Sequence, residues 1–274
     1  MRFPGLHSFE YPFVKGLTVR FDKLEFGPAP EDSGNEAPLP VEKDFSYWFR
    51  EADTNRRIGQ YENALRYYSR ALEEDKAQVL AWVGQVQMLV LLSEYPQARL
   101  WSQKALELFP NNPDLLSAQS QAECRLGNIS TALKLSDAAL LQRGESAYQW
   151  QVRAELSVAT KKTGDIPSFD KAELANRDWL VSLESSIIYL FYDCYSKAQQ
   201  RARVAVEKAP DACYCWYIMG VCGQKLGFIE SAQRNYSRCL ELSPHHREAE
   251  QRLFEINQSG WSVGRLLRRM IGRK

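Results

Sequence analysis

The sequence has little net charge, few histidines and no long apolar run. Its 274 residues carry 35 lysines and arginines against 34 aspartates and glutamates, a net charge of +1. A balance so close to zero excludes a chain that binds nucleic acid over its whole surface, and it excludes a strongly acidic disordered chain. No window approaches the roughly 18 apolar residues that a membrane-spanning helix requires. With 45% hydrophobic and 25% charged residues, the composition is that of an ordinary globular protein.

Cysteine and histidine are too few, or wrongly spaced, for the common metal and catalytic motifs. The amino terminus has no signal-peptide pattern, so we expect the six cysteines to be reduced and the protein to be cytoplasmic. Cys213, Cys215, Cys222 and Cys239 cluster, but they lack the paired C-x-x-C spacing of zinc sites. Walker-type loops, G-x-S-x-G elements and dinucleotide fingerprints are missing too. We therefore predict a protein that is not an enzyme and uses no metal or cofactor.

Charge and proline are distributed unevenly along the chain. No acidic residue follows Glu255, and the five basic residues after it give this end +5, which leaves −4 for the remainder of the +1 total. Four of the twelve prolines lie between Pro28 and Pro40 among acidic residues. This composition predicts an exposed linker over 28–44. Before it, the leader over 1–27 is rich in aromatic residues, and alternation over 17–21 predicts one short strand.

The rest of the chain is periodic. Ala64, Ala98 and Ala132 are spaced by 34 residues, and so are Ala198 and Ala232. A second small residue follows each alanine seven positions later, which is two helical turns, so both lie on one face where a neighbouring helix can approach closely. Sixteen positions before the alanines stand mostly large residues: Trp48, Trp82, Leu116, Ser182 and Trp216.

A period of 34 with these features resembles the tetratricopeptide repeat family. In the best match, residues 213–246, the motif positions are held by Trp216, Gly220, Gly227, Ala232, Tyr236, Cys239 and Pro244. The resemblance divides residues 45–246 into units at 45–78, 79–112, 113–146, 147–178, 179–212 and 213–246. The unit at 147–178 is two residues short and loses the pattern near Pro167, so its second helix is left undecided.

The resemblance implies an all-α fold, a right-handed superhelical solenoid of about six antiparallel helix pairs, one of them degenerate. Each pair buries its apolar face only against its neighbours, so the last pair requires a solvating cap. The mainly polar segment over 247–258 is predicted to be that capping helix.

In this family the first helix of each unit lines the concave surface, so the resemblance also implies a groove. The residues expected to bind a partner there are Arg50, Arg57, Leu80, Val83, Gln87, Leu91, Leu183, Ile187, Phe191, Tyr217 and Gln224. Apart from its charged first unit, this groove is apolar and favours a helix or an extended apolar peptide of a partner protein. The alternative is that packing within the chain covers these side chains, for example by the segment before Phe45.

One subclass of the family grips the C-terminal carboxylate of heat-shock chaperones with lysine and asparagine at fixed groove positions. The corresponding positions here hold Phe49, Asp53, Gly84, Asp114 and Ala118. An apolar ring, two acids and two small groups donate no hydrogen bond to a carboxylate. We therefore do not expect this activity.

The basic tail over 259–274 combines apolar residues at amphipathic-helix spacing with arginines between them. The tail residues expected to contact a membrane or a partner are Trp261, Arg265, Leu266, Leu267, Arg268, Arg269, Met270, Ile271 and Arg273. A helix this short is unstable alone in water, so we expect it to fold at a surface. An anionic membrane is one such surface, where each basic group contributes about 1 kcal/mol. The last repeats and an acidic groove of a partner are alternatives, and RNA is a weaker one.

These features predict a non-catalytic scaffold or adaptor that binds protein partners. An assembly or secretion chaperone that shields an apolar client segment is an alternative. A structural subunit of a larger complex is another, with the leader strand added to a neighbour's sheet edge. We expect a cytoplasmic protein, peripheral at the inner membrane face if the tail binds lipid, and the oligomeric state is left open.

Overall fold

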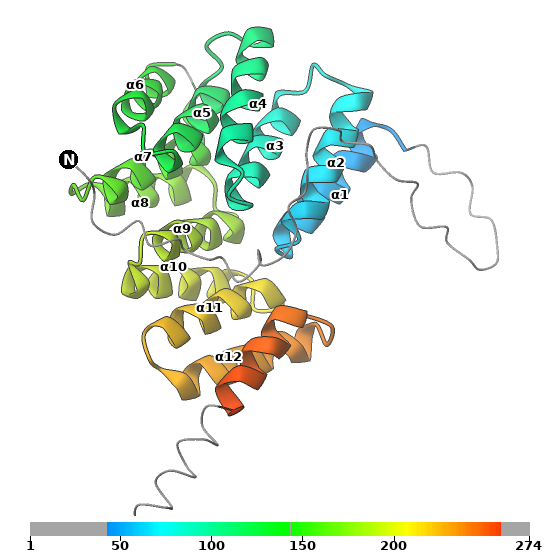
Figure 1. Ribbon diagram of the computed structural model, residues 1–274, viewed down its shortest axis with the longest axis vertical. Helices are drawn as coiled ribbons and strands as arrows, with labels where there is room; N and C mark the ends of the chain where they lie inside the picture. The colour runs from blue at the N-terminus through cyan, green and yellow to red at the C-terminus, as the bar shows by residue number, and fades with distance from the viewer. Residues whose placement is uncertain (1–42, 143, 259–274) are drawn as a thin grey trace, which may run out of the picture. The chain divides into compact units, whose positions relative to one another are not determined.

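The computed structural model describes residues 43–142 and 144–258, and within these ranges the chain contains helices and no strand (Figure 1). The leader with its predicted strand, nearly all of the linker, and the basic tail lie outside the described residues. The expectations for these segments stay predictions.

Twelve consecutive helices of the described part pack as six pairs (Figure 1). The pairs are α1 (Phe45–Arg57) with α2 (Tyr61–Glu74), α3 (Val79–Leu91) with α4 (Tyr95–Leu108), α5 (Pro113–Arg125) with α6 (Ile129–Leu140), α7 (Ala147–Ala159) with α8 (Asp165–Ala175), α9 (Trp179–Phe191) with α10 (Tyr195–Lys208), and α11 (Cys213–Lys225) with α12 (Ile229–Leu242). Each pair falls within one of the predicted repeat units, and the expected all-α solenoid is present. The undecided second helix of the unit at 147–178 forms as α8, which has 11 residues.

The small residues of the repeat lie where neighbouring helices touch. All ten are completely buried, because a larger side chain would hold the helices apart. They are Ala64, Ala71, Ala98, Ala105, Ala132, Ala139, Ala198, Ala205, Ala232 and Cys239. The spacing in the sequence therefore marks the contacts that build the solenoid.

Two glycines make room for buried tyrosine rings. A methyl group on Gly84 would lie 2.5 Å from Cζ of Tyr68, and one on Gly220 would lie 2.5 Å from Cε1 of Tyr236. Both tyrosines are nearly inaccessible to solvent. The glycines are thus required for close packing in helices α3 and α11, although glycine is a poor helix former.

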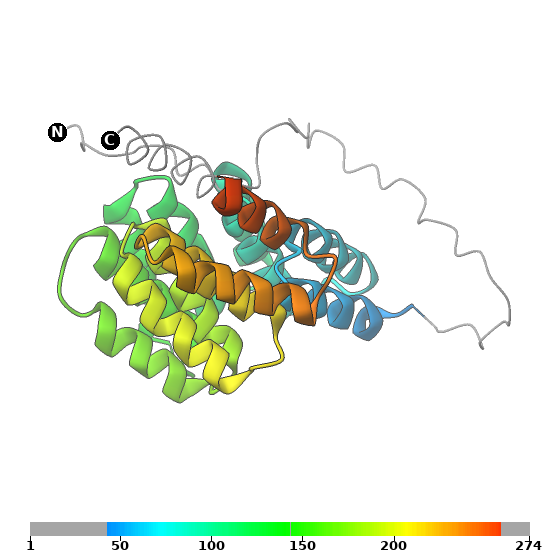
Figure 2. The ribbon, with the colours of Figure 1, turned by 90° about the horizontal axis from the view of Figure 1, so that it is seen from below.

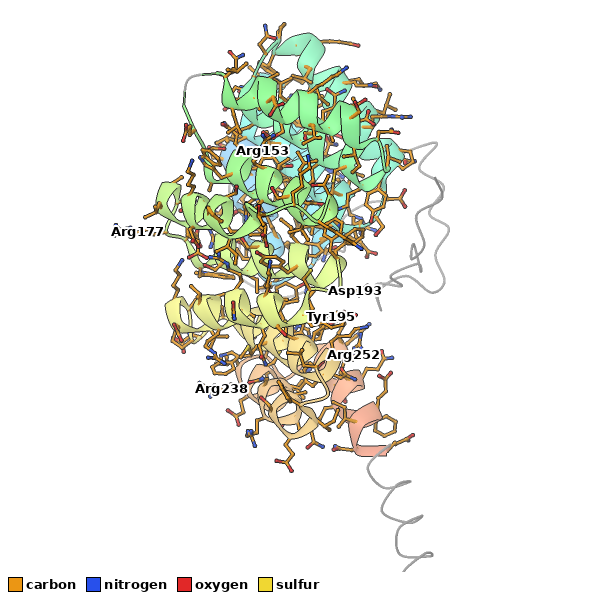
Figure 3. All side chains as sticks on the ribbon, turned by 90° about the vertical axis from the view of Figure 1, so that its left-hand side faces the viewer. Arg153, Arg177, Asp193, Tyr195, Arg238 and Arg252 are labelled. Atoms are coloured by element: carbon orange, nitrogen blue, oxygen red, sulfur yellow. The ribbon has the colours of Figure 1, made fainter. Side chains whose placement is uncertain are left out.

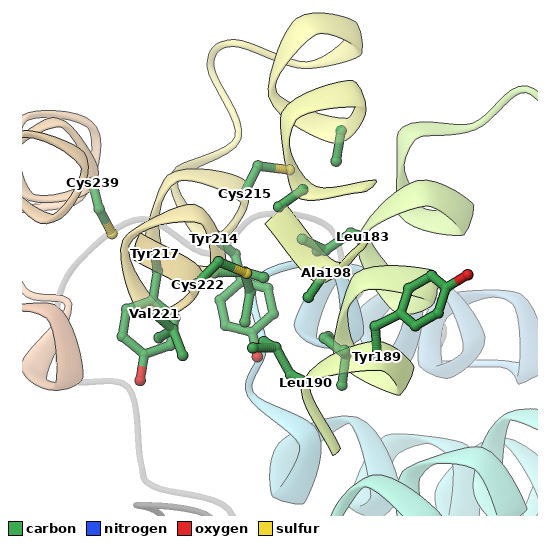
Figure 4. Packing of buried hydrophobic residues seen from close by; sticks show 14 of the residues in the cluster. Leu183, Tyr189, Leu190, Ala198, Tyr214, Cys215, Tyr217, Val221, Cys222 and Cys239 are labelled. Atoms are coloured by element: carbon green, nitrogen blue, oxygen red, sulfur yellow. The ribbon is translucent and has the colours of Figure 1, made fainter. Parts of the chain in front are cut away.

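The apolar core is divided into two main clusters. One joins α1 to α5, and the other joins α9 to α12 with residues of α7 and α8 (Figure 4). A further helix over 247–258 packs beside α12 and buries Ala249 and Ile256 (Figure 2). Gln233 in α12 donates a hydrogen bond to Asn257 of this helix at 2.9 Å. This is the predicted capping helix, which covers the open face of the last pair.

Charged side chains cover the outer surface of the described helices, where Arg177 and Arg238 project outward (Figure 3). Some of them form surface ion pairs, such as Arg153 with Asp137 at 2.6 Å. Pairs of this kind contribute little to stability because water screens them. The more informative charges lie on the inner side of the solenoid.

Candidate partner-binding site

A cavity of about 420 Å³ lies on the side formed by the first helices of the pairs, and we call it the inner cavity. Its walls come from α1, α3, α5, α7 and α9, together with Tyr68 of α2 and the segment between α8 and α9. The lining residues are Phe49, Asp53, Arg56, Arg57, Tyr68, Leu80, Val83, Gly84, Gln87, Asp114, Ser146, Ala147, Tyr148, Gln151, Ala175, Asn176, Asp178, Leu180, Val181 and Glu184. Helices that are distant in the sequence therefore line the same inner cavity.

Four of the predicted groove residues line the inner cavity: Arg57, Leu80, Val83 and Gln87. Leu80, at the start of α3, keeps 62% of its surface exposed, whereas Val83 and Gln87, one and two turns further on, are buried. Arg50 is exposed on α1 outside the cavity lining. Leu80 is therefore an exposed large apolar side chain in the lining of this cavity.

Three other predicted groove residues lie inside the second core cluster. Leu183, Ile187 and Tyr217 are each less than 4% exposed, and half-buried Leu91 packs against the same cluster. The apolar wall expected at α9 and α11 is therefore covered by the chain itself, as the alternative interpretation of the sequence proposed. A role of these residues in partner binding stays a prediction, and it requires that the cluster open.

The last two predicted groove residues are partly covered by neighbouring side chains. Phe191 stacks its ring under the guanidinium of Arg125, whose Cζ lies 3.5 Å from the ring centroid. Gln224 accepts a hydrogen bond from the hydroxyl of Tyr236 at 2.8 Å. Both residues are half-buried, and neither lines the inner cavity.

Ion pairs between α1 and the α9 region close one side of the inner cavity. Arg56 binds Glu184 with 2.5 Å between Nη2 and Oε1, and both side chains are largely buried. Burial by itself would lower the pKa of Arg56, but the attraction and hydrogen bonding of Glu184 and Tyr68 together outweigh it and raise that pKa. This ion pair joins the first helix pair to the fifth.

A second ion pair lies beside the first. Arg57 binds Asp178 with 2.5 Å between Nη2 and Oδ2, and it also binds Asp53 with 2.7 Å between Nε and Oδ2. Burial alone would raise the pKa of Asp178, but the hydrogen bonds from Arg57 and the backbone of Leu180, together with the charges of Arg56 and Arg57, outweigh it, so the pKa lies below its ordinary value. Asp178 also caps α9 by accepting from the backbone N–H of Leu180.

The turn between α1 and α2 contacts the last helix pair. The hydroxyls of Tyr61 and Tyr214 lie 3.1 Å apart. A methyl group on Gly59 would come within 2.3 Å of the Tyr214 ring, and the backbone of Gly59 has φ of +79°. Glycine is required here both for the left-handed turn and for the approach of the ring. The first unit therefore touches the fifth and the sixth units.

The inner cavity is acidic. Its lining has four carboxylates against two guanidinium groups, a net side-chain charge of −2. Both arginines are paired with carboxylates, whereas Asp114 accepts from neutral groups, Ser146 Oγ at 2.5 Å and Gln149 Nε2 at 3.2 Å. A cationic group that enters the cavity can therefore reach a carboxylate held by uncharged donors.

Sequence reasoning missed Tyr148, Asp178 and Glu184 as cavity residues. Tyr148 lies in the degenerate fourth unit, where its hydroxyl donates to Gln121 Oε1 at 2.8 Å. The two acids gain their role only because α1 comes to lie beside α9. Within a single repeat, nothing in the pattern indicates how far the solenoid must turn for that contact.

Within residues 43–142 and 144–258, no group of three or more histidine, cysteine, aspartate or glutamate side chains is arranged to hold a metal ion. None of the helices in those ranges is both long and apolar enough to cross a membrane.

Comparison with known proteins gives one family match. A family model for the tetratricopeptide repeat matches residues 45–78, the first unit of the solenoid. No curated protein sequence matches the chain significantly.

Several solved structures resemble the chain at low sequence identity. A tetratricopeptide repeat protein from Parabacteroides merdae is 15% identical, with 79% of this chain and 86% of that chain covered and a TM-score of 0.49. A thermophilic TPR protein of Thermus thermophilus is 16% identical, with coverage of 78% and 99% and a TM-score of 0.47. YrrB, described as a TPR protein with an unusual peptide-binding site, is 17% identical, with coverage of 67% and 96% and a TM-score of 0.39. These likenesses are too distant to assign a ligand to this chain.

Residues 45–78 match the family model, and the pairs α3–α4, α5–α6, α9–α10 and α11–α12 recur with small residues buried at equivalent contacts. Tetratricopeptide repeats generally serve as scaffolds for contacts between proteins. Residues 45–78 therefore form a tetratricopeptide repeat, and the described helices build the solenoid that is typical of such repeats.

Proposed function

We propose that this chain is a non-catalytic scaffold that binds an extended segment of a partner protein in the inner cavity. The observation that carries the proposal is the exposed side chain of Leu80 in a cavity whose other lining groups include Asp53 and Asp114. Covering an exposed leucine with an apolar group of a ligand is favourable, because it removes apolar area from water. A partner segment with an apolar residue flanked by lysine or arginine could contact both Leu80 and these carboxylates.

The size and charge of the cavity limit which kind of partner segment can enter it. The inner cavity holds about 420 Å³. An extended segment that inserts two or three side chains fits this volume. The net negative charge also disfavours a segment that ends in a free carboxylate.

A matched pair of substitutions tests the proposal. Leu80→Glu places a like charge beside the cavity acids, whereas Leu108→Glu changes a leucine of similar exposure on α4, outside the cavity lining. The tagged full-length chain and both variants are expressed in the source organism, and co-purified proteins are quantified by mass spectrometry. We expect Leu80→Glu to lose specific partners that Leu108→Glu retains. Equal recovery by the two variants would refute binding in the inner cavity.

The chaperone alternative requires a different surface. An apolar client segment would need the wall at α9 and α11, which is buried in this structure. Glutamate at Leu183 or Ile187 would disrupt that core and would therefore measure folding rather than client binding. Cross-linking of a client to positions on α9 distinguishes the two functions, because the scaffold proposal expects no client there.

The basic tail is proposed as a second contact, with an anionic membrane surface or a partner's acidic groove as its target. Five basic side chains would contribute roughly 5 kcal/mol at an anionic membrane before ordering costs. A cytoplasmic location and peripheral membrane association follow from this part of the proposal. Sedimentation with vesicles of anionic and of neutral lipid, with and without residues 259–274, tests it. Equal sedimentation of the two chains would exclude the membrane contact.

A further inference from the structure

The carboxylate of Asp114 differs from the other three carboxylates of the inner cavity in the groups that hold it. The other three each bind one of the two cavity arginines. Asp114 lies in the first turn of α5, and among residues 43–142 and 144–258 it has no hydrogen bond or ion pair to a basic side chain. Its negative charge is therefore left without a compensating cation in the part of the chain that the structure describes.

Uncharged donors hold Asp114 through one of its two oxygens. Oδ1 accepts a hydrogen bond from Ser146 Oγ at 2.5 Å and another from Gln149 Nε2 at 3.2 Å. Oδ2 accepts no hydrogen bond from any residue that the structure describes. Because Asp114 is half-buried and lines the cavity, a donor that enters the cavity can reach this carboxylate.

Gln149 orients Asp114 at a cost to its own hydrogen bonding. The residue is 1% exposed, and its Nε2 donates to Asp114 and to the backbone carbonyl of Gly144 at 3.1 Å. Its Oε1 is buried without a hydrogen-bond partner among the described residues, which is unfavourable. Turning the amide over would bring Oε1 against the carboxylate, and two acceptors repel each other. An unpaired buried group that orients a neighbouring charge is expected where that charge serves a binding site.

Asp114 belongs to a row of equivalent positions along the cavity. Leu80, Asp114 and Tyr148 are the second residues of α3, α5 and α7, and all three line the cavity. Successive members of the row are 34 residues apart in the sequence. Helix α5 contacts both α3 and α7 directly. The exposed leucine and the tyrosine ring are therefore the neighbours of the open carboxylate in this row.

The open carboxylate favours one class of side chain. Lysine and arginine carry hydrogen-bond donors and no acceptor, whereas amides and hydroxyls carry both. A hydrogen bond between a cation and a carboxylate is also about twice as strong as one between neutral groups. An acidic side chain is repelled, because the lining has a net side-chain charge of −2. A basic side chain is therefore the best match.

We propose that Asp114 selects a lysine or arginine of the bound segment, while Leu80 covers an apolar residue of the same segment. This inference rests on the proposed function and adds the specificity of the same cavity. Packed helices lie about 10 Å apart, so equivalent positions on α3 and α5 have about that separation. An extended chain spans this distance in about three residues. The recognised motif is thus a basic and an apolar residue two to three positions apart.

Selection from a peptide library measures this specificity without a known partner. Phage that display random short peptides are selected on the full-length unmodified chain, on Asp114→Asn and on the control Asp137→Asn. Asp137 is a surface acid of α6 that pairs with Arg153 and does not line the cavity. We expect the unmodified chain and Asp137→Asn to enrich the motif about tenfold or more, because the basic residue gains a charge-assisted hydrogen bond. Asp114→Asn should lose the preference for the basic residue alone.

A double-mutant cycle on one selected peptide measures the contact itself. The basic residue of the peptide is replaced by an uncharged analogue, citrulline for arginine or norleucine for lysine, and Kd is measured by fluorescence anisotropy. On the unmodified chain we expect this replacement to weaken binding about tenfold or more. Asp114→Asn should bind both peptides alike, whereas Asp114→Glu, which keeps the charge, should retain a difference. Equal weakening on the unmodified chain and on Asp114→Asn would overturn the proposal.

The outcomes separate this inference from the proposed function. Leu80→Ser, which removes the apolar contact without adding charge, shows whether the selected peptides bind in the inner cavity. Peptides that require Leu80 but have no preference for a basic residue would overturn the role of Asp114 and leave the proposed function standing. A selection with no enrichment on the unmodified chain, or with peptides that Leu80→Ser binds equally well, would contradict both.

Discussion

Alanine substitutions at Gly220 and Gly223 test how the last repeat is packed. Both glycines lie in α11, three residues apart. A methyl group on Gly220 would lie 2.5 Å and 2.6 Å from two atoms of the Tyr236 ring, whereas one on Gly223 would be 3.5 Å from the nearest atom, the backbone nitrogen of Ala232. Only the methyl group on Gly220 is so close that the neighbouring side chain, Tyr236, must move. Tyr236 has little freedom, because it is completely buried and its hydroxyl is bound to Gln224.

The expected difference follows from two opposing effects. Replacing glycine by alanine inside a helix stabilises it by up to about 1 kcal/mol. Overpacking a buried site costs about 1–3 kcal/mol. The helix gain is common to both variants and cancels in their comparison. Gly220→Ala should therefore be less stable than Gly223→Ala by about 1–3 kcal/mol. The free energy of unfolding of Gly223→Ala should equal or exceed that of the unmodified chain.

Urea unfolding followed by far-ultraviolet circular dichroism measures this difference. When the variants share the same slope of unfolding free energy against urea concentration, differences between their midpoints report differences in the free energy of unfolding. Equal midpoints for Gly220→Ala and Gly223→Ala would refute the packing of Tyr236 against Gly220. A more stable Gly220→Ala would refute it more strongly.

Three further outcomes are expected. Because the folded pKa of Asp178 lies below its unfolded value, this group contributes stability above about pH 4 that is lost as the pH falls through the folded pKa. Asp178→Asn should thus lose less stability than the unmodified chain between neutral pH and pH about 3 in urea titrations, and an equal loss would contradict the pairing with Arg57. Arg125→Met leaves Glu155 buried without its ion-pair partner and should lower the free energy of unfolding by about 3–5 kcal/mol; a loss below about 1 kcal/mol would argue against the pair. Deletion of residues 259–274 should leave the thermal midpoint unchanged while removing sedimentation with anionic vesicles, and a large drop in the midpoint would indicate a tail docked on the repeats.

The helix pairs could be predicted because the contacts that build them are local. The 34-residue spacing of Ala64, Ala98 and Ala132 indicates helix contacts, and all three alanines are completely buried. The second helix of the degenerate unit was harder to predict from the sequence. Helix α8 keeps buried contacts through Phe169 and Ala172, but the repeat pattern around these residues is lost.

The inner cavity was less predictable because it depends on contacts between distant units. Arg56 and Glu184 are 128 residues apart in the sequence, and they meet only after the rotation between successive pairs has accumulated over four units. A small error in that rotation would separate them. Leu183 and Ile187, which we expected on an open wall of the groove, lie instead in the core cluster formed mainly by α9 to α12. Leu80 lines the inner cavity and is exposed.

Photo-cross-linking from inside the cavity tests the central claim most directly. The photoreactive amino acid p-benzoylphenylalanine is introduced at Leu80, or at Leu108 as the control of similar exposure. The cells are then irradiated and the tagged chain is purified under denaturing conditions. We predict a discrete covalent adduct with a partner protein from position 80 that is missing from position 108. Adducts that are absent from position 80, or that are the same from both positions, would contradict a partner segment in the inner cavity.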